Sequence, residues 1–167
     1  RVFIHVGAGD GVPAATERFD HPLYTHALAH PFEQMIAALC VVAGGLLERF
    51  PRIKFAFMEA GCGWVPYWME RLDDHYEILQ PTVPWLTKPP SEYMRSGQMF
   101  YAFEMDEKML PYVAEFVGAD RLVFATDYNH SDSKFPHTVE EVMERGDISE
   151  GLKAKIMGAN AAKLYNL

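Results

Sequence analysis

The chain has 167 residues, of which 49% are apolar, and a formal net charge of −8 at pH 7. This length suits one domain with a substantial core. The negative charge argues against nucleic acid or an anionic membrane as a partner, because both require a positively charged face. The longest apolar stretch, 35–47, is too short to span a bilayer, and no signal peptide is recognisable. Two cysteines, Cys40 and Cys62, do not make a disulfide framework, so we expect a protein of the reducing cytoplasm.

Strand patterns and helix patterns alternate along the chain, which is typical of βα units around a parallel sheet. A long loop rich in Gly and Pro is expected at 7–29. Strands are predicted at 2–6, 53–58, 99–103 and 122–126. Helices are predicted at 30–50, with Pro31 in its first turn, and at 64–79, 106–117, 138–144 and 149–165. We therefore expect a single α/β domain over 1–167.

Four βα units are half of a closed (β/α)₈ barrel, which takes about 250 residues. Four buried parallel strands left open would present two long apolar edges, which soluble proteins avoid. Three solutions follow from the residues alone. The chain is the second half of a longer protein with four more units before it, or it closes by pairing with another copy, or it forms a small open sheet with covered edges.

The candidate chemistry lies where the last predicted strand ends. The apolar run 122–125 has no alternation, which indicates a strand buried on both faces, and it leads into Asp127 and His130. Parallel sheets hold their ligands outside the carboxyl ends of their strands. His5 ends the first predicted strand at that same edge, so the fold would bring it near Asp127. Imidazole nitrogen and carboxylate oxygen suit a borderline cation such as Zn²⁺, which predicts His5 and Asp127 as metal ligands.

A second carboxylate, Glu59, ends the second predicted strand. A Glu in this position either transfers a proton, ligates a cation, or has a structural role, paired with an Arg or bonded to the amides of Gly61 and Gly63. Cys62 lies between these two glycines, where a tight loop that lets the backbone approach a ligand is expected rather than a thiolate nucleophile.

Of the other histidines, His30 and His130 are the candidates for substrate contacts. His21, His26, His75 and His137 are expected at the surface or as capping residues. Trp64, Tyr67 and Trp68 recur at helical spacing, which indicates core packing.

Several motifs occur together in order: VFIHVGAG, HPFEQMIAA, GGLLERFPRIKFAFMEAGCGWVPYWMERLD, RLVFATDYNHSD and IMGANAAKLYNL. With them the chain resembles the amidohydrolase-related metal-dependent hydrolases and decarboxylases, in the branch of the aminocarboxymuconate semialdehyde decarboxylase-like enzymes. The resemblance covers nearly the whole chain. It implies a TIM barrel of which this chain supplies the last four βα units and a C-terminal helix.

In that family the metal is held by a His-x-His pair on the first strand, a His on the fifth and an Asp on the eighth. The resemblance equates His5 with the fifth-strand ligand and Asp127 with the eighth-strand ligand, whereas the His-x-His pair is absent from this sequence. Glu59 departs from the family, which carries a catalytic His at that strand end, and it is therefore the candidate proton carrier, with Asp127 binding the metal or moving the proton.

The expected function is hydrolysis or non-oxidative decarboxylation of a small carboxylated or cyclic substrate with a divalent metal, Zn²⁺ being the first candidate. The alternative is a catalytically silent half-barrel whose edges serve only for assembly. The expected partners are a small-molecule substrate and either a second copy of the chain or a missing N-terminal half.

Overall fold

The computed structural model describes residues 1–5, 13–14, 16–130 and 133–167. Four strands form one parallel sheet in the order β1-β2-β3-β4. The strands are β1 (Val2–Ile4), β2 (Phe55–Phe57), β3 (Met99–Ala102) and β4 (Leu122–Val123). All four predicted strands are confirmed, each shorter than expected. Val6, which the sequence placed in the first strand, lies outside the described residues.

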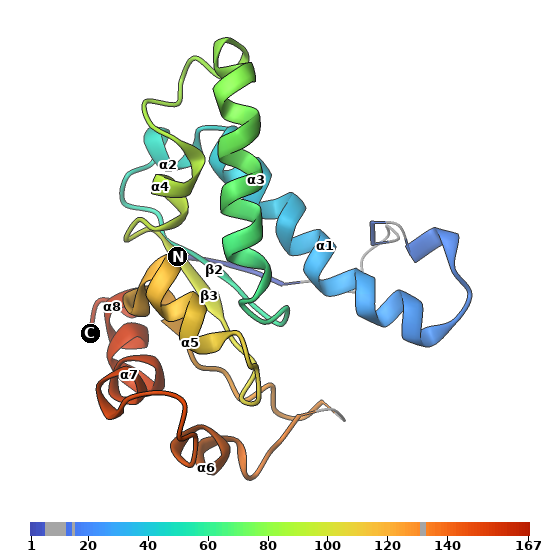
Figure 1. The fold of residues 1–167 in the computed structure, drawn as a ribbon, viewed down its shortest axis with the longest axis vertical. Coiled ribbons are helices and arrows are strands. Elements are labelled where there is room, and N and C mark those ends of the chain that lie inside the picture. The colour runs from blue at the N-terminus through green and yellow to red at the C-terminus, as the bar shows by residue number, and fades with distance from the viewer. Residues whose placement is uncertain (6–12, 15, 131–132) are drawn as a thin grey trace.

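Helices follow each strand, as the alternation predicts (Figure 1). The α-helices are α1 (Pro22–Ala43), α2 (Leu46–Arg49), α3 (Trp64–Leu79), α4 (Pro90–Met94), α5 (Leu110–Val113), α6 (Thr138–Met143), α7 (Glu150–Ala154) and α8 (Asn160–Tyr165). Short 3₁₀ turns occur at Thr16–Arg18, Gln80–Thr82 and Ala119–Arg121, and π-helical turns at Ala114–Gly118 and Lys155–Ala159. The second of these π turns joins α7 to α8, so the helix predicted at 149–165 is confirmed, with Ser149 as its N-cap.

The first helix begins earlier than the sequence predicted. His21 is the N-cap of α1, its Nδ1 accepting from the Leu23 amide at 3.2 Å, and Pro22 occupies the first turn. Pro31, predicted in the first turn, lies inside the helix instead, and Pro22 is the proline of the first turn. Residues 22–29, predicted as loop, are helical, and 7–12 and 15 lie outside the described residues.

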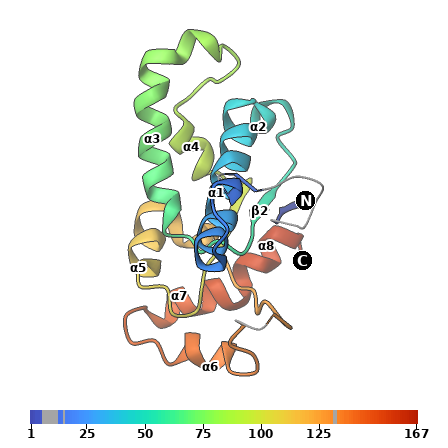
Figure 2. The ribbon, with the colours of Figure 1, turned by 90° about the vertical axis from the view of Figure 1, so that its right-hand side faces the viewer.

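Length and composition alone would allow α1 to cross a membrane, although the longest uninterrupted apolar stretch, 35–47, only overlaps its C-terminal half. Core helices meet the same criterion, and α1 has core residues: Gln34, Ala38, Val41 and Val42 are buried. Its N-terminal half projects beyond the sheet (Figure 1). The turned view places α2 and the C-terminal half of α1 above the sheet, with α6 and α7 below it (Figure 2).

Alternate residues of the strands face two different environments. Phe55, Phe57 and Tyr101 pack into the main core beneath α1, α3 and α5, where Trp64 is also buried. On the other face Phe100 and Val123 pack against Leu164 of α8. Burial on both faces explains why these strands are apolar runs without alternation.

A buried amide holds the carboxyl ends of the first two strands together. Gln34 of α1 is fully buried, and its Nε2 donates to the carbonyl of Ile4 at 3.0 Å and to that of Met58 at 2.9 Å. The residues that follow these carbonyls are His5 and Glu59. The helix therefore fixes the two backbone segments that carry the predicted site.

The start of α3 is held by a carboxylate from a neighbouring loop. Glu107 accepts from the amides of Cys62 at 3.0 Å and Gly63 at 2.6 Å. Arg145 supports that loop by donating to the carbonyls of Met105 at 2.8 Å and Glu107 at 2.9 Å. The amides of a helix N-terminus favour a negative charge, so Glu107 acts as its cap.

Cys62 is buried against the same carboxylate. Its Sγ lies 3.3 Å from Glu107 Oε2, and burial, reinforced by the Glu107 charge, raises the pKa of the thiol far above its usual range. A protonated thiol is a poor nucleophile, which supports the structural interpretation of this loop. Cys40, in contrast, is exposed, and both cysteines are free.

Substitution of Gln34 tests its role at the strand ends. Gln34→Leu removes the donor from two carbonyls, so we expect the free energy of unfolding to fall by about 1–3 kcal/mol. Gln80→Leu, which changes an exposed glutamine, should shift it by less than about 0.5 kcal/mol. Chemical denaturation monitored by circular dichroism measures both, and equal stabilities of the two variants would contradict the assignment.

Alkylation tests the environment of Cys62. With iodoacetamide at about pH 8, where an ordinary thiol with a pKa near 8.5 is partly ionised, the folded protein should take one label, on Cys40, and two labels after denaturation. Mass spectrometry of the peptides locates them, and Cys40→Ser should leave the folded protein unlabelled. Labelling of Cys62 in the folded protein at a rate similar to Cys40 would show an accessible thiolate instead.

Candidate functional site

The carboxyl ends of β2, β3 and β4 open onto one pocket of about 830 Å³. Its walls come from α1 and from the loops that follow β2, β3 and β4. The residues that line it are His26, His30, Pro31, Glu59, Ala60, Gly61, Glu104, Met105, Asp106, Glu107, Asp127, His130, Ser133 and Lys134. The pocket therefore lies at the edge of the sheet where the sequence predicted it.

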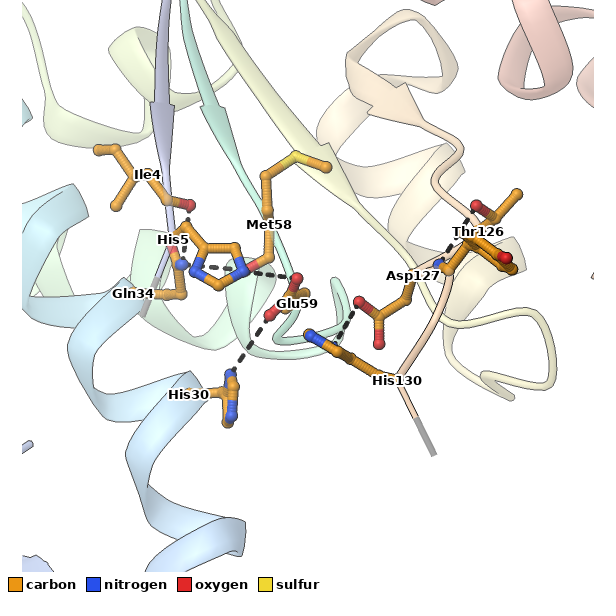
Figure 3. Close-up of polar contacts among 10 residues, drawn as sticks. Ile4, His5, His30, Gln34, Met58, Glu59, Thr126, Asp127 and His130 are labelled. Atoms are coloured by element: carbon orange, nitrogen blue, oxygen red, sulfur yellow. Dashed lines mark hydrogen bonds and ion pairs between the residues drawn. The ribbon is translucent and has the colours of Figure 1, made fainter. Parts of the chain in front are cut away.

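Two strand-end carboxylates occupy a strained backbone conformation. Glu59 has φ 58° and Asp127 has φ 52°, which places both in the left-handed region. That region costs a residue with a side chain about 1–2 kcal/mol, and such strain concentrates at functional sites. The conformation turns both carboxylates into the pocket at the ends of strands that β3 separates (Figure 3).

Each of these carboxylates contacts an imidazole. His5 Nε2 lies 2.5 Å from Glu59 Oε1, and His130 Nδ1 lies 2.9 Å from Asp127 Oδ1. Glu59 and Asp127 are largely buried, with side chains 22% and 28% exposed, whereas both imidazoles are about half exposed. Imidazole beside a carboxylate can share a proton with it or ligate the same cation.

His30 approaches from α1. Its Nδ1 is buried, has no hydrogen-bond partner among the described residues, and lies 4.0 Å from Glu59 Oε2 (Figure 3). The ring of His26, one turn earlier, lies 5.5 Å from that of His30. Both line the pocket, so His26, which the sequence analysis assigned to the surface or to capping, reaches the site as well.

Three donor groups are close enough to hold one cation. Ligand atoms of Glu59, Asp127 and His130 all lie within 4.8 Å of one another. Two carboxylate oxygens and one imidazole nitrogen form a donor set that divalent Zn²⁺ and Mn²⁺ accept. The residues therefore fit the metal that the sequence predicts. His5, predicted as a ligand together with Asp127, is not one of these three residues and instead contacts Glu59.

The sequence located five of these side chains and missed others. His5, Glu59 and Asp127 were found because each directly follows a predicted strand, and His30 and His130 because one precedes Pro31 of a predicted helix and the other follows Asp127 in the same loop. Glu107, Asp106 and Lys134 were not singled out, although they lie in the loops after β3 and β4, where polar residues are common for many reasons. Asp132, in the loop after His130, lies outside the described residues.

The remaining minor predictions have mixed outcomes. His75 is exposed and pairs with its own helix, Nδ1 to Arg71 O at 2.9 Å. His137 precedes α6 as its N-cap residue without a side-chain cap bond. Trp64 and Trp68 pack in or against the core as expected, whereas Tyr67 is exposed.

Comparison with known proteins gives relatives among decarboxylases. The chain is 25% identical over 142 residues to the 2-amino-3-carboxymuconate-6-semialdehyde decarboxylase of Dictyostelium discoideum, which covers 82% of this chain and 38% of that protein. It is 26% identical over 142 residues to the gamma-resorcylate decarboxylase of a Polaromonas species, covering 81% of this chain and 41% of the relative. The chain thus spans less than half the length of these relatives.

Solved structures show the same fold. The 5-carboxyvanillate decarboxylase of Sphingomonas paucimobilis superposes with a TM-score of 0.80 at 25% identity, over 99% of this chain and 49% of that one. A dihydroxybenzoic acid decarboxylase of Polaromonas, solved with bound manganese and the inhibitor 2-nitroresorcinol, gives 0.76 at 23% identity, over 99% and 49%.

The resemblance read from the sequence motifs is confirmed by a family profile as well. The profile described as Amidohydrolase matches residues 2–167, almost the full chain. The match includes all four strand ends and the Glu59, Asp127 and His130 cluster. This protein belongs to the amidohydrolase family, in the branch whose relatives include the aminocarboxymuconate semialdehyde and gamma-resorcylate decarboxylases.

Proposed function

We propose that this chain forms part of the active site of a metal-dependent, non-oxidative decarboxylase that acts on a small aromatic or unsaturated carboxylate. The observation that carries the proposal is the set of Glu59, Asp127 and His130 ligand atoms within 4.8 Å of one another in a pocket at the strand ends. The relatives named as decarboxylases support the reaction. The silent half-barrel has no comparable support.

Asp127 and His130 would hold a divalent cation together with Glu59. When bound, such a cation polarises a carbonyl or carboxylate oxygen and neutralises charge that develops on the substrate. Zn²⁺ remains our first candidate from the donor types, and the manganese in a structural relative makes Mn²⁺ the alternative to test beside it.

Decarboxylation replaces a carboxylate on carbon by a proton, so the site needs a group that holds a proton near the reacting carbon. We assign this to the His5 and Glu59 pair, whose Nε2 and Oε1 atoms are 2.5 Å apart. The imidazole can carry the proton and the carboxylate can pass it on. In this role His5 acts through Glu59, whereas the sequence alone predicts His5 as a metal ligand. The substitutions below separate the two roles.

The half-barrel interpretation belongs to the same proposal. Chain order and strand order agree, all strands are parallel, and about half of each structural relative is matched. We propose that these four βα units pair with four others, whether from the same protein or from a second copy, and that such units supply further ligands. A cytoplasmic location also stays a prediction.

Removal of a ligand should lower metal content. We expect Asp127→Asn to reduce bound metal several-fold while the fold is retained, because Asn tolerates the left-handed backbone and leaves no cavity. Elemental analysis after equilibration with Mn²⁺ or Zn²⁺ measures this. Asp74→Asn, which changes an exposed carboxylate on α3 outside the pocket, is the matched control. Parental metal content in Asp127→Asn would overturn the cation site.

His5 and Glu59 are separated by comparing metal content with turnover. His5→Gln should keep its metal and lose roughly 10²-fold in turnover of 2,6-dihydroxybenzoate, because the proton source is gone. Glu59→Gln should lose both metal and turnover. A fall of metal content in His5→Gln would return His5 to the ligand set, and a fully metallated Glu59→Gln with low turnover would make Glu59 a proton carrier only. Unchanged turnover in both variants would contradict the mechanism.

A further inference from the structure

The pocket is lined by carboxylates on three of its sides. Glu59, Glu104, Asp106, Glu107 and Asp127 all contribute to its wall. Among the described lining residues, one side chain carries a permanent positive charge, and it is Lys134. An anionic substrate entering this pocket meets repulsion from the carboxylates, so a positively charged side chain in the pocket wall favours its recognition.

Most of the carboxylates already have strong partners. Glu107 accepts from backbone amides, Glu59 contacts His5, and Asp127 contacts His130. Asp106 differs, because its partner is Lys134: Asp106 Oδ2 and Lys134 Nζ are 3.5 Å apart, and the side chains are 65% and 43% exposed. This is a long, solvated ion pair that costs little to break.

The backbone that carries Lys134 is held firmly. Ser133 Oγ donates to the carbonyl of Thr126 at 2.8 Å, and the amide of His137 donates to the carbonyl of Lys134 at 2.8 Å. The first bond ties Ser133 to Thr126, the residue before Asp127. The side chain of Lys134, with its flexible four-carbon stem, is then free to exchange one oxygen partner for another.

We propose that Lys134 recognises the carboxylate of the substrate, and that Asp106 is the counter-ion which this carboxylate replaces. The inference rests on the proposed function, since it names the group that selects an anionic substrate for the same pocket. Lys134 lies in the loop after β4 that carries Asp127 and His130, so an anion bound to it shares the pocket with the proposed cation site. The ion pair with Asp106 keeps the ammonium at the pocket while no substrate is present.

Binding of benzoate and of its neutral counterpart benzamide tests the proposal without turnover. We expect the parent protein to bind benzoate more tightly than benzamide, and Lys134→Met to weaken benzoate binding about fivefold or more with benzamide unchanged. Asp106→Asn should strengthen benzoate binding, because the competing carboxylate is removed. Ligand-observed NMR titration measures the affinities, and Lys108→Met, an exposed lysine outside the pocket, is the control.

The titrations are run with Mn²⁺ and after its removal. Equal benzoate affinity in Lys134→Met and the parent overturns the assignment, as does a parent without preference for benzoate. Weaker benzoate binding by Asp106→Asn overturns the exchange of partners. Lys134→Gln replaces the Met variant if the latter unfolds. Failure of the parent protein to bind Mn²⁺ would contradict the proposed function but not the role of Lys134, because the metal-free titrations still test that role.

Discussion

The contacts of Glu107 join the elements on which the site depends. One carboxylate from the loop after β3 binds the amides at the start of α3, three residues beyond Glu59, and Arg145 holds the loop from the far side. A partly buried carboxylate is costly unless hydrogen bonds satisfy it, and here a helix N-terminus supplies them. The short turn between β2 and α3 is thereby fixed, and with it the left-handed backbone of Glu59.

The pocket gathers several carboxylates, which is more negative charge than the binding of a neutral ligand needs. Two carboxylates with left-handed backbones face one another across a few ångströms, each with an imidazole beside it. Without a cation, the two carboxylates repel one another. A divalent cation removes this repulsion, so the close approach of the two carboxylates supports the proposed metal site.

Much of the fold could be predicted from the sequence, because parallel strands buried on both faces leave apolar runs that end abruptly in polar residues. The ends of 53–58 and 122–126 gave Glu59 and Asp127 in this way. The predicted start of α1 was wrong because Pro22 and Pro31 both satisfy the preference for proline in the first turn of a helix. Local propensity does not decide between them. The helix is continuous through Pro31, with Gln34 anchored to the sheet one turn later.

The contacts of Gln34, Glu107 and Lys134 could not be predicted, since each joins segments far apart in the chain. A glutamine within an apolar helix pattern looks like a solvent-facing position, and only the fold places its amide against two strand carbonyls. Likewise a loop Glu gives no sign that its partners are amides some 45 residues earlier. Periodicity reports which face of an element is buried, and it carries no information on these pairings.

The order of the strands has a consequence for the way the chain folds. Each strand pairs with the next one in the sequence, β1 with β2, β2 with β3 and β3 with β4. Each of these pairings therefore joins strands that are consecutive in the chain. Loop closure then costs a similar entropy at every step, and the strand of each new βα unit can pair with the edge strand that has already formed. Such a sheet can grow in the direction of synthesis, unit by unit, while the ribosome is still making the rest.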